Sequence, residues 1–150
     1  MLITAKEVIE ISFTGEENIK ENRIPDSVIE SAQEKYLRPV LTGLHDHLTK
    51  PAYTQFVNDY IKPPLAFFVR YLVLPSMSIQ LSNMGAFLPE TDFSKTATDR
   101  QRDTLRQSAL SIAEPLLEKA VRYIEENRSG FPEYVKKSRT VNKVKGGIVF

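Results

Sequence analysis

The chain lacks cysteine and tryptophan altogether among its 150 residues. Without cysteine it can form no disulfide, thiol nucleophile or thiolate metal site, so it does not need an oxidising compartment. The six glycines and nine prolines together make up only about 10% of the chain, which excludes a collagen-like or low-complexity chain. No charge dominates either, because 20 basic and 19 acidic residues leave a net charge of +1. This balance argues against a protein dedicated to coating DNA.

Long hydrophobic runs are also missing. The most apolar stretch, 65–74, is only ten residues long, contains Arg70 and is bordered by prolines. A bilayer requires about 20 apolar residues, so this stretch predicts a buried helix and no membrane span. The N-terminus has neither the basic nor the long apolar region of a signal peptide.

Sequence patterns of catalytic sites are absent too. The chain contains no GxSxG, HExxH, Walker-type or GxGxxG pattern. The two histidines, His45 and His47, point about 200° apart on a helix, so they cannot share one metal ion there. Adjacent carboxylates such as Glu125 and Glu126 fit a solvated helix surface better than a convergent acid–base pair. We therefore expect no enzyme, and no cofactor, metal site or small-molecule substrate.

Hydrophobic residues, 41% of the chain, recur mainly at helical spacing. Thr4 and Glu7 predict a capped opening helix, and Thr14 and Glu17 repeat that spacing for a short second helix ending near residue 22. An apolar stripe then predicts one long helix over 24–48, kinked at Pro39.

Two further helices are expected. The first runs over 50–74 and is interrupted by Pro63 and Pro64. The other begins near Thr98, bends at Pro115 and ends before Gly130. Its surface charges are mixed, and Glu118 and Arg122 have the spacing of a helix-supporting ion pair. The predicted fold is an all-α bundle of four to five helices with proline kinks.

Residues 75–97 interrupt this helical pattern. Proline, serine, asparagine and glycine recur there, which predicts a long irregular insertion. Within it, two short apolar runs flank 83–85, so residues 79–88 could form a small β-hairpin with Gly85 at its turn.

The last sixteen residues have a different character. We divide the chain into a helical domain, 1–134, and a flexible basic tail, 135–150. The tail has no acidic residue, and it ends in two glycines and three apolar residues. It could be a solubilising end, or an arm that docks on an acidic protein surface, on DNA phosphates or on a sheet edge, with 147–150 as an added strand. The candidate partner-binding residues are Lys136, Lys137, Arg139, Lys143, Lys145 and Phe150.

Several segments together resemble a known family. They are the capped opening helix over 3–8, the long helix over 24–48, the start of the central helix over 60–66, and the aromatic turn over 131–134. Across residues 2–134 this arrangement resembles the small all-helical head–tail connector proteins of tailed bacteriophages, also called adaptor or head-completion proteins. The type found in phages and prophages of gut Bacteroidetes is the most similar.

The resemblance implies a structural protein of the virion head–tail junction that is assembled in the bacterial host cytoplasm. Connector subunits form a closed ring, commonly of about twelve copies, under the portal protein. The ring extends the DNA channel, with DNA only as passing cargo, and presents a platform for the next tail component. The alternative is a small helical nucleic-acid-binding or regulatory module that uses the basic tail.

Overall fold

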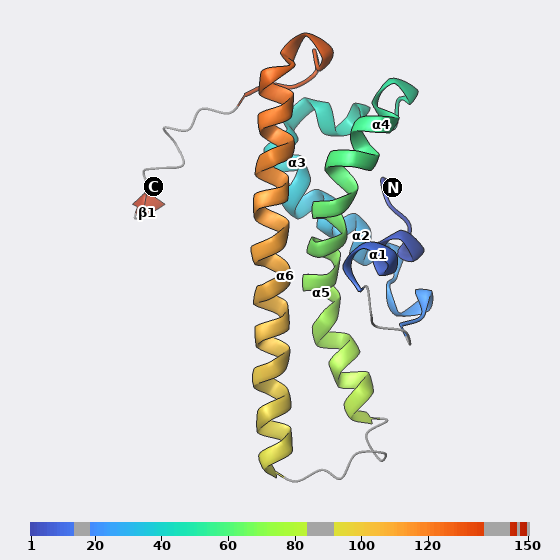
Figure 1. The fold of residues 1–150 in the computed structure, drawn as a ribbon, viewed down its shortest axis with the longest axis vertical. Coiled ribbons are helices and arrows are strands. Elements are labelled where there is room, and N and C mark those ends of the chain that lie inside the picture. The colour runs from blue at the N-terminus through green and yellow to red at the C-terminus, as the bar shows by residue number, and fades with distance from the viewer. Residues whose placement is uncertain (14–18, 84–91, 137–144, 147, 150) are drawn as a thin grey trace.

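The computed structural model describes the backbone of residues 1–13, 19–83, 92–136, 145–146 and 148–149. Side chains are described for these residues except 77–83, 92–99, 102 and those after 136. Two long helices, α5 (Lys62–Asn83) and α6 (Asp92–Glu126), run antiparallel and pack along each other (Figure 1). The described part of the chain is mostly helical, which confirms the predicted all-α class.

The shorter segments gather along the upper half of the α5–α6 pair, and the opposite ends of α5 and α6 project beyond them (Figure 1). In chain order these segments are α1 (Ala5–Ser12), the 3₁₀ turn η1 (Glu21–Arg23), α2 (Asp26–Ala32), the π-helical η2 (Gln33–Leu37), α3 (Arg38–Leu41), the 3₁₀ helices η3 (Thr42–His47) and η4 (Pro51–Tyr53), α4 (Thr54–Phe56), the π-helical η5 (Val57–Ile61) and the 3₁₀ turn η7 (Arg128–Gly130).

The core lies between α5, α6 and the shorter helices. From α5, Leu65 and Val69 are fully buried, and α6 faces them with the small residues Ala113 and Ala120. Small side chains at these positions let the two helix backbones approach closely. The core therefore consists of one continuous cluster that includes residues of α1, α2 and α3.

The opening helix forms as its sequence predicts. The Thr4 hydroxyl accepts a hydrogen bond from the Glu7 backbone N–H, and the Glu7 carboxylate accepts one from the Thr4 N–H, which completes the capping box. Lys62 of α5 also donates to the Glu7 carboxylate, and this bond ties α1 to the start of the central helix. The second predicted capping box, at 14 and 17, lies outside the described residues.

The prediction of a single long helix over 24–48 is wrong. The structure has four successive segments there, α2, η2, α3 and η3. Its α-helical part ends at Leu41, where Thr42 adopts a positive φ of 52°. Residues other than glycine rarely adopt this backbone conformation, so contacts with another part of the chain must hold Thr42 in it. The chain then continues as the 3₁₀ helix η3.

Pro39 and Pro63 each follow a π-helical turn. The Arg38 N–H bonds to the carbonyl of Gln33, and the Lys62 N–H bonds to the carbonyl of Val57, five residues earlier in both cases. Because proline cannot donate to the carbonyl four residues before it, a local π turn is one way to accommodate it. The expected break at Pro63 is therefore wrong, since the helical path continues into α5.

The prediction of an irregular insertion over 75–97 is also wrong for most of this range. Helix α5 continues through Pro75 to Asn83, and α6 begins at Asp92, so the expected first strand of the hairpin, at 79–81, is helical. Pro75 leaves the carbonyl of Tyr71 without its usual donor, and the Arg106 Nε of α6 donates to that carbonyl at 3.3 Å. This contact from a distant helix replaces the missing backbone bond. The rest of the predicted hairpin, 84–88, lies outside the described residues.

Two short strands lie near the C-terminus. β1 (Lys145–Gly146) pairs antiparallel with β2 (Ile148–Val149), with Lys145 opposite Val149. The tail segment considered as an added strand for a partner's sheet thus includes a strand that pairs within this chain.

Candidate interaction surfaces

One face of α6 is exposed and almost free of charge. Leu105 and Ile112 lie seven residues apart on this face and keep 43% and 41% of their surface exposed. We call the face the α6 seam, and its exposed members are Gln101, Leu105, Ser108, Ile112, Pro115 and Lys119. They follow one another at steps of four and three, which is the spacing of a helix–helix contact. Lys119 carries the only charge among them.

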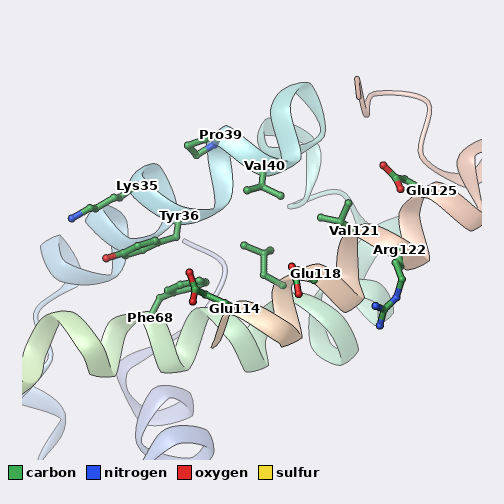
Figure 2. Close-up of a pocket in the computed structure, with 11 residues that line it drawn as sticks. Lys35, Tyr36, Pro39, Val40, Phe68, Glu114, Glu118, Val121, Arg122 and Glu125 are labelled. Carbon is green, nitrogen blue, oxygen red and sulfur yellow. The ribbon is translucent and has the colours of Figure 1, made fainter. Parts of the chain in front are cut away.

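A groove lies on nearly the opposite side of α6. It has a volume of about 740 Å³ and runs between α6 and the η2–α3 segment, over α5 (Figure 2). Its apolar part includes Val40, Leu117, Val121 and the rings of Tyr36 and Phe68. These rings are stacked with centroids 4.2 Å apart. The groove therefore offers a flat aromatic surface between two helical walls.

The α6 wall of this groove is acidic. Glu114, Glu118 and Glu125 line it, as Figure 2 shows, against the cations Lys35 and Arg122. The expected ion pair between Glu118 and Arg122 is not among the ion pairs of the described side chains, and Figure 2 shows Arg122 directed away from the groove.

The segment after α6 is bound back onto the body. The hydroxyl of Thr42 accepts from the Val135 N–H at 3.0 Å and donates to the Val135 carbonyl at 2.9 Å. A Cβ added at Gly43 would stand 2.8 Å from the carbonyl oxygen of Glu133, so only glycine permits this close approach. These contacts explain the conformation of Thr42, and they place Val135 on the body, although we expected the tail to begin at that residue.

The side chain of Glu133 also holds the segment after α6 against the body. We call this contact region, between residues 42–53 and 133–135, the junction. Its carboxylate accepts from the Tyr53 hydroxyl and from the Lys50 Nζ, the latter at 2.9 Å. These two hydrogen bonds lower the pKa of Glu133 to about 2. Burial, together with the bond to this carboxylate, raises the pKa of Tyr53 to about 12. The junction is therefore charged at Glu133 and neutral at Tyr53 around pH 7.

Aromatic rings reinforce this end of the molecule. Phe131 packs against Phe56 with centroids 4.7 Å apart and stacks on Tyr53 at 5.5 Å. Tyr60 stacks on Tyr123 of α6 at 4.4 Å. Tyr53, Phe56 and Phe131 are buried, and Tyr60 and Tyr123 pack against them from the edge of the core. The turn over 131–134 lies back on the bundle through these contacts.

Of the six predicted partner-binding residues, the structure describes the side chain of one. Lys136 is exposed, and its Nζ lies 3.8 Å from the Oε2 of Glu125 at one end of the groove. Lys145 has a described backbone in β1. Lys137, Arg139, Lys143 and Phe150 lie outside the described residues. The chain thus approaches an acidic groove residue just before its cationic segment.

The histidine pair shows a feature that its sequence did not reveal. His45 is buried, and neither ring nitrogen has a hydrogen-bond partner in the described part of the chain. Burial lowers the pKa of His45, and the nearby Arg38 adds to this effect. A search of the described residues finds no cluster of ligands that could hold a metal ion.

The sequence did not reveal the groove, because Tyr36, Val40 and Phe68 have the same spacing as core residues. The one available signal is the acidic series at 114, 118 and 125, which lies on one side of the helix. Mixed surface charge on this helix, taken alone, does not distinguish a groove wall from a solvated face.

Comparisons with known proteins give a family without an assigned function. None of the described helices is long and apolar enough to span a bilayer. No curated protein and no solved structure matches the chain. A family of unknown function, DUF6712, matches residues 12–143, and the chain belongs to this family.

Proposed function

We propose that this protein is a structural subunit of a bacteriophage head–tail connector, assembling as a ring under the portal and around the DNA channel. In this role it would bind copies of itself, the portal protein and the next tail component, and DNA would pass through without being held. The proposal extends the resemblance described above. The all-α fold is consistent with that family.

The observation that carries the proposal is the α6 seam. A monomeric protein has little reason to keep Leu105 and Ile112 exposed in line on a helix face with so little charge. A ring subunit needs two different faces that complement each other, because each copy contacts its neighbours through heterologous interfaces. The seam supplies one such face, with the spacing suited to a helix of the next copy.

The charge distribution also supports a channel that does not hold DNA. Five cations lie after residue 135 and no acid follows Glu133, so the helical body up to residue 134 carries the remaining net charge of about −4. A negative body repels phosphates along a bore, while the cationic tail remains available for a protein partner.

The seam can be tested by placing lysines on it. We expect Leu105→Lys with Ile112→Lys to abolish ring assembly, because each interface would bury two new charges. The matched control, Gln107→Lys with Ser111→Lys, adds the same charges to exposed positions off the seam. Mass photometry of the concentrated protein, with and without its portal, would measure the assemblies. Rings that persist in the seam variant, or a monomer for the unmodified chain in both settings, would contradict the proposal.

The run of cations in the tail favours a second candidate function, binding of nucleic acid. A nucleic-acid module would lose DNA affinity steeply with salt, and replacing the tail lysines and arginine with glutamine would remove that dependence. A connector subunit would bind short duplex DNA weakly at physiological salt, with or without the tail cations. A salt titration of DNA binding therefore separates the two functions.

A further inference from the structure

We propose that the acidic groove receives the α6 seam of a second copy of this chain, so that copies join head to tail. The groove is the one between α6 and the η2–α3 segment, over α5. This inference rests on the proposed function and deepens it, because it names the surface that the seam of the next subunit contacts.

Charge complementarity is the first argument. The groove presents Glu114 and Glu118, which are exposed, and neither carboxylate forms an ion pair with a described side chain. Lys119 of the seam is also exposed and forms no such ion pair, and its ammonium lies 5.8 Å from the centroid of the Tyr60 ring. A seam helix in the groove would bring this cation to carboxylates that the described body leaves unpaired.

The cations that line the groove leave its acidic wall accessible. The ammonium of Lys35 lies 5.4 Å from the centroid of the Tyr36 ring, at the far end of the groove from Glu125 (Figure 2). Arg122 is directed away from the cavity. Because Arg122 follows Lys119 by three residues on α6, it adds a second cation beside the seam.

The apolar side chains of the two surfaces match as well. Val40 and Val121 are half-buried and line the groove from opposite walls, with the Tyr36 ring beside them (Figure 2). Leu105 and Ile112 of the seam are exposed. Since both surfaces are apolar and in contact with water, their association removes apolar area from water on both copies at once.

The lengths of the two surfaces agree. At a helical rise of about 1.5 Å per residue, Leu105 and Ile112 are about 10 Å apart along the seam. The α6 wall of the groove, from Glu114 to Glu125, extends about 16 Å. Both aliphatic side chains can therefore enter one groove, and their spacing of seven residues is that of side chains in a helix–helix contact.

The seam and the groove face different directions, so one copy can use both. Ile112 and Glu114 are two residues apart on α6, which places their side chains about 160° apart around the helix axis. Each copy can insert its seam into one neighbour and receive the seam of another, which is a heterologous interface. A seam that pairs with a second seam would instead stop at a dimer and leave the groove uncovered.

Two variants of the full chain, each without one of the surfaces, test this pairing. The seam variant carries Leu105→Lys with Ile112→Lys, and the groove variant carries Glu114→Lys with Glu118→Lys. All four positions are exposed, so we expect both variants to fold, and circular dichroism verifies it. An equimolar mixture should form 1:1 mixed dimers and nothing larger, because one variant retains the groove and the other retains the seam. Native mass spectrometry identifies the mixed dimer, since the two chains differ in mass.

The groove variant alone gives a second measurement. We expect it to weaken self-association by at least about tenfold, because lysines at the groove wall repel Lys119 of the incoming seam. A matched control carries Glu10→Lys with Glu21→Lys, which reverses the same number of charges at exposed positions outside the groove. The control should assemble as the unmodified chain does, and sedimentation over a concentration series compares the three proteins.

The inference is overturned if the mixed variants remain monomers or if the groove variant assembles as well as the control. Dimers of the groove variant alone would mean that seams pair with each other. Rings that persist in the groove variant would remove only the groove as the receiving surface, and the connector proposal would stand. A monomeric unmodified chain, alone and with the portal, would overturn both proposals.

Discussion

At the scale of single residues, a few close contacts determine the path of the chain where periodicity alone fails. Thr42 and Gly43 end the helix that the apolar stripe predicts, because Glu133 and Val135 dock there from the other end of the sequence. A partner about 90 residues away cannot be inferred from local spacing. By contrast, the capping box at Thr4 is local, and the sequence predicts it correctly.

Gly43 gives the first prediction. Gly43→Ala should destabilise the protein by about 1–3 kcal/mol, because the new Cβ would overlap the Glu133 carbonyl oxygen. Gly130→Ala is the control, since a Cβ there has no neighbour within 4 Å. Urea unfolding monitored by circular dichroism measures both changes. Equal, small effects of both substitutions would show that residues 43 and 133 are not in close contact in solution.

His45 gives a prediction on pH. Its pKa is lower in the folded state than the ordinary value of 6.5, mainly because the ring is buried. The unfolded chain therefore binds the proton more readily, and stability should fall as the pH drops below about 6.5. His45→Leu should remove that component of the pH dependence between pH 7.5 and 5. Thermal midpoints across this range test it, and identical slopes for both proteins would contradict it.

At the scale of elements, the structure departs most from the sequence predictions at prolines. Pro75 was expected to end a helix, yet α5 continues because Arg106 of α6 donates to the carbonyl that Pro75 cannot serve. The helix over 105–124 forms as its period predicts, but only part of its apolar stripe is buried, because Ala113, Ala120 and Ile124 lie in the core while Leu105 and Ile112 are exposed. When a residue from a distant helix bonds to the carbonyl that proline leaves free, the local sequence around the proline does not indicate that the helix continues.

The contact between Arg106 and Tyr71 can be measured with a double-mutant cycle. Arg106→Met should cost about 1–2 kcal/mol, because it leaves the Tyr71 carbonyl unpaired and removes a guanidinium that lies 4.4 Å from the Tyr71 ring. In a Pro75→Ala background the alanine N–H can serve that carbonyl, so the same change should cost less. Equal costs in the two backgrounds would contradict this account of how α5 passes Pro75.

At the scale of the whole molecule, the structure combines a helical body with a cationic segment that follows Lys136. The division into body and tail stays a prediction, and the described contacts extend the body to Val135 through Thr42. The sequence could not predict the groove, since its residues have the spacing of core residues and the groove is formed only where α5, α6 and the η2–α3 segment come together. The α6 seam was also not foreseen, because an exposed stripe and a buried one share the same period.

A truncation after Lys136 tests the division into body and tail. Because the hydrogen bonds of Val135 and the ring contacts of Phe131 remain, the shortened chain should keep its helical circular dichroism and its cooperative thermal unfolding. The connector proposal adds that, in a pull-down, the shortened chain binds the portal more weakly than the full chain. Loss of the fold would show that the tail belongs to the core, and unchanged binding would remove its role as a docking arm.

Electron microscopy of the concentrated full-length protein, alone and mixed with the portal protein that the connector proposal gives it as a partner, tests the central claim most directly. The connector proposal predicts annular particles of uniform size that are absent when Leu105 and Ile112 are both lysine. Isolated monomers in both preparations would contradict it.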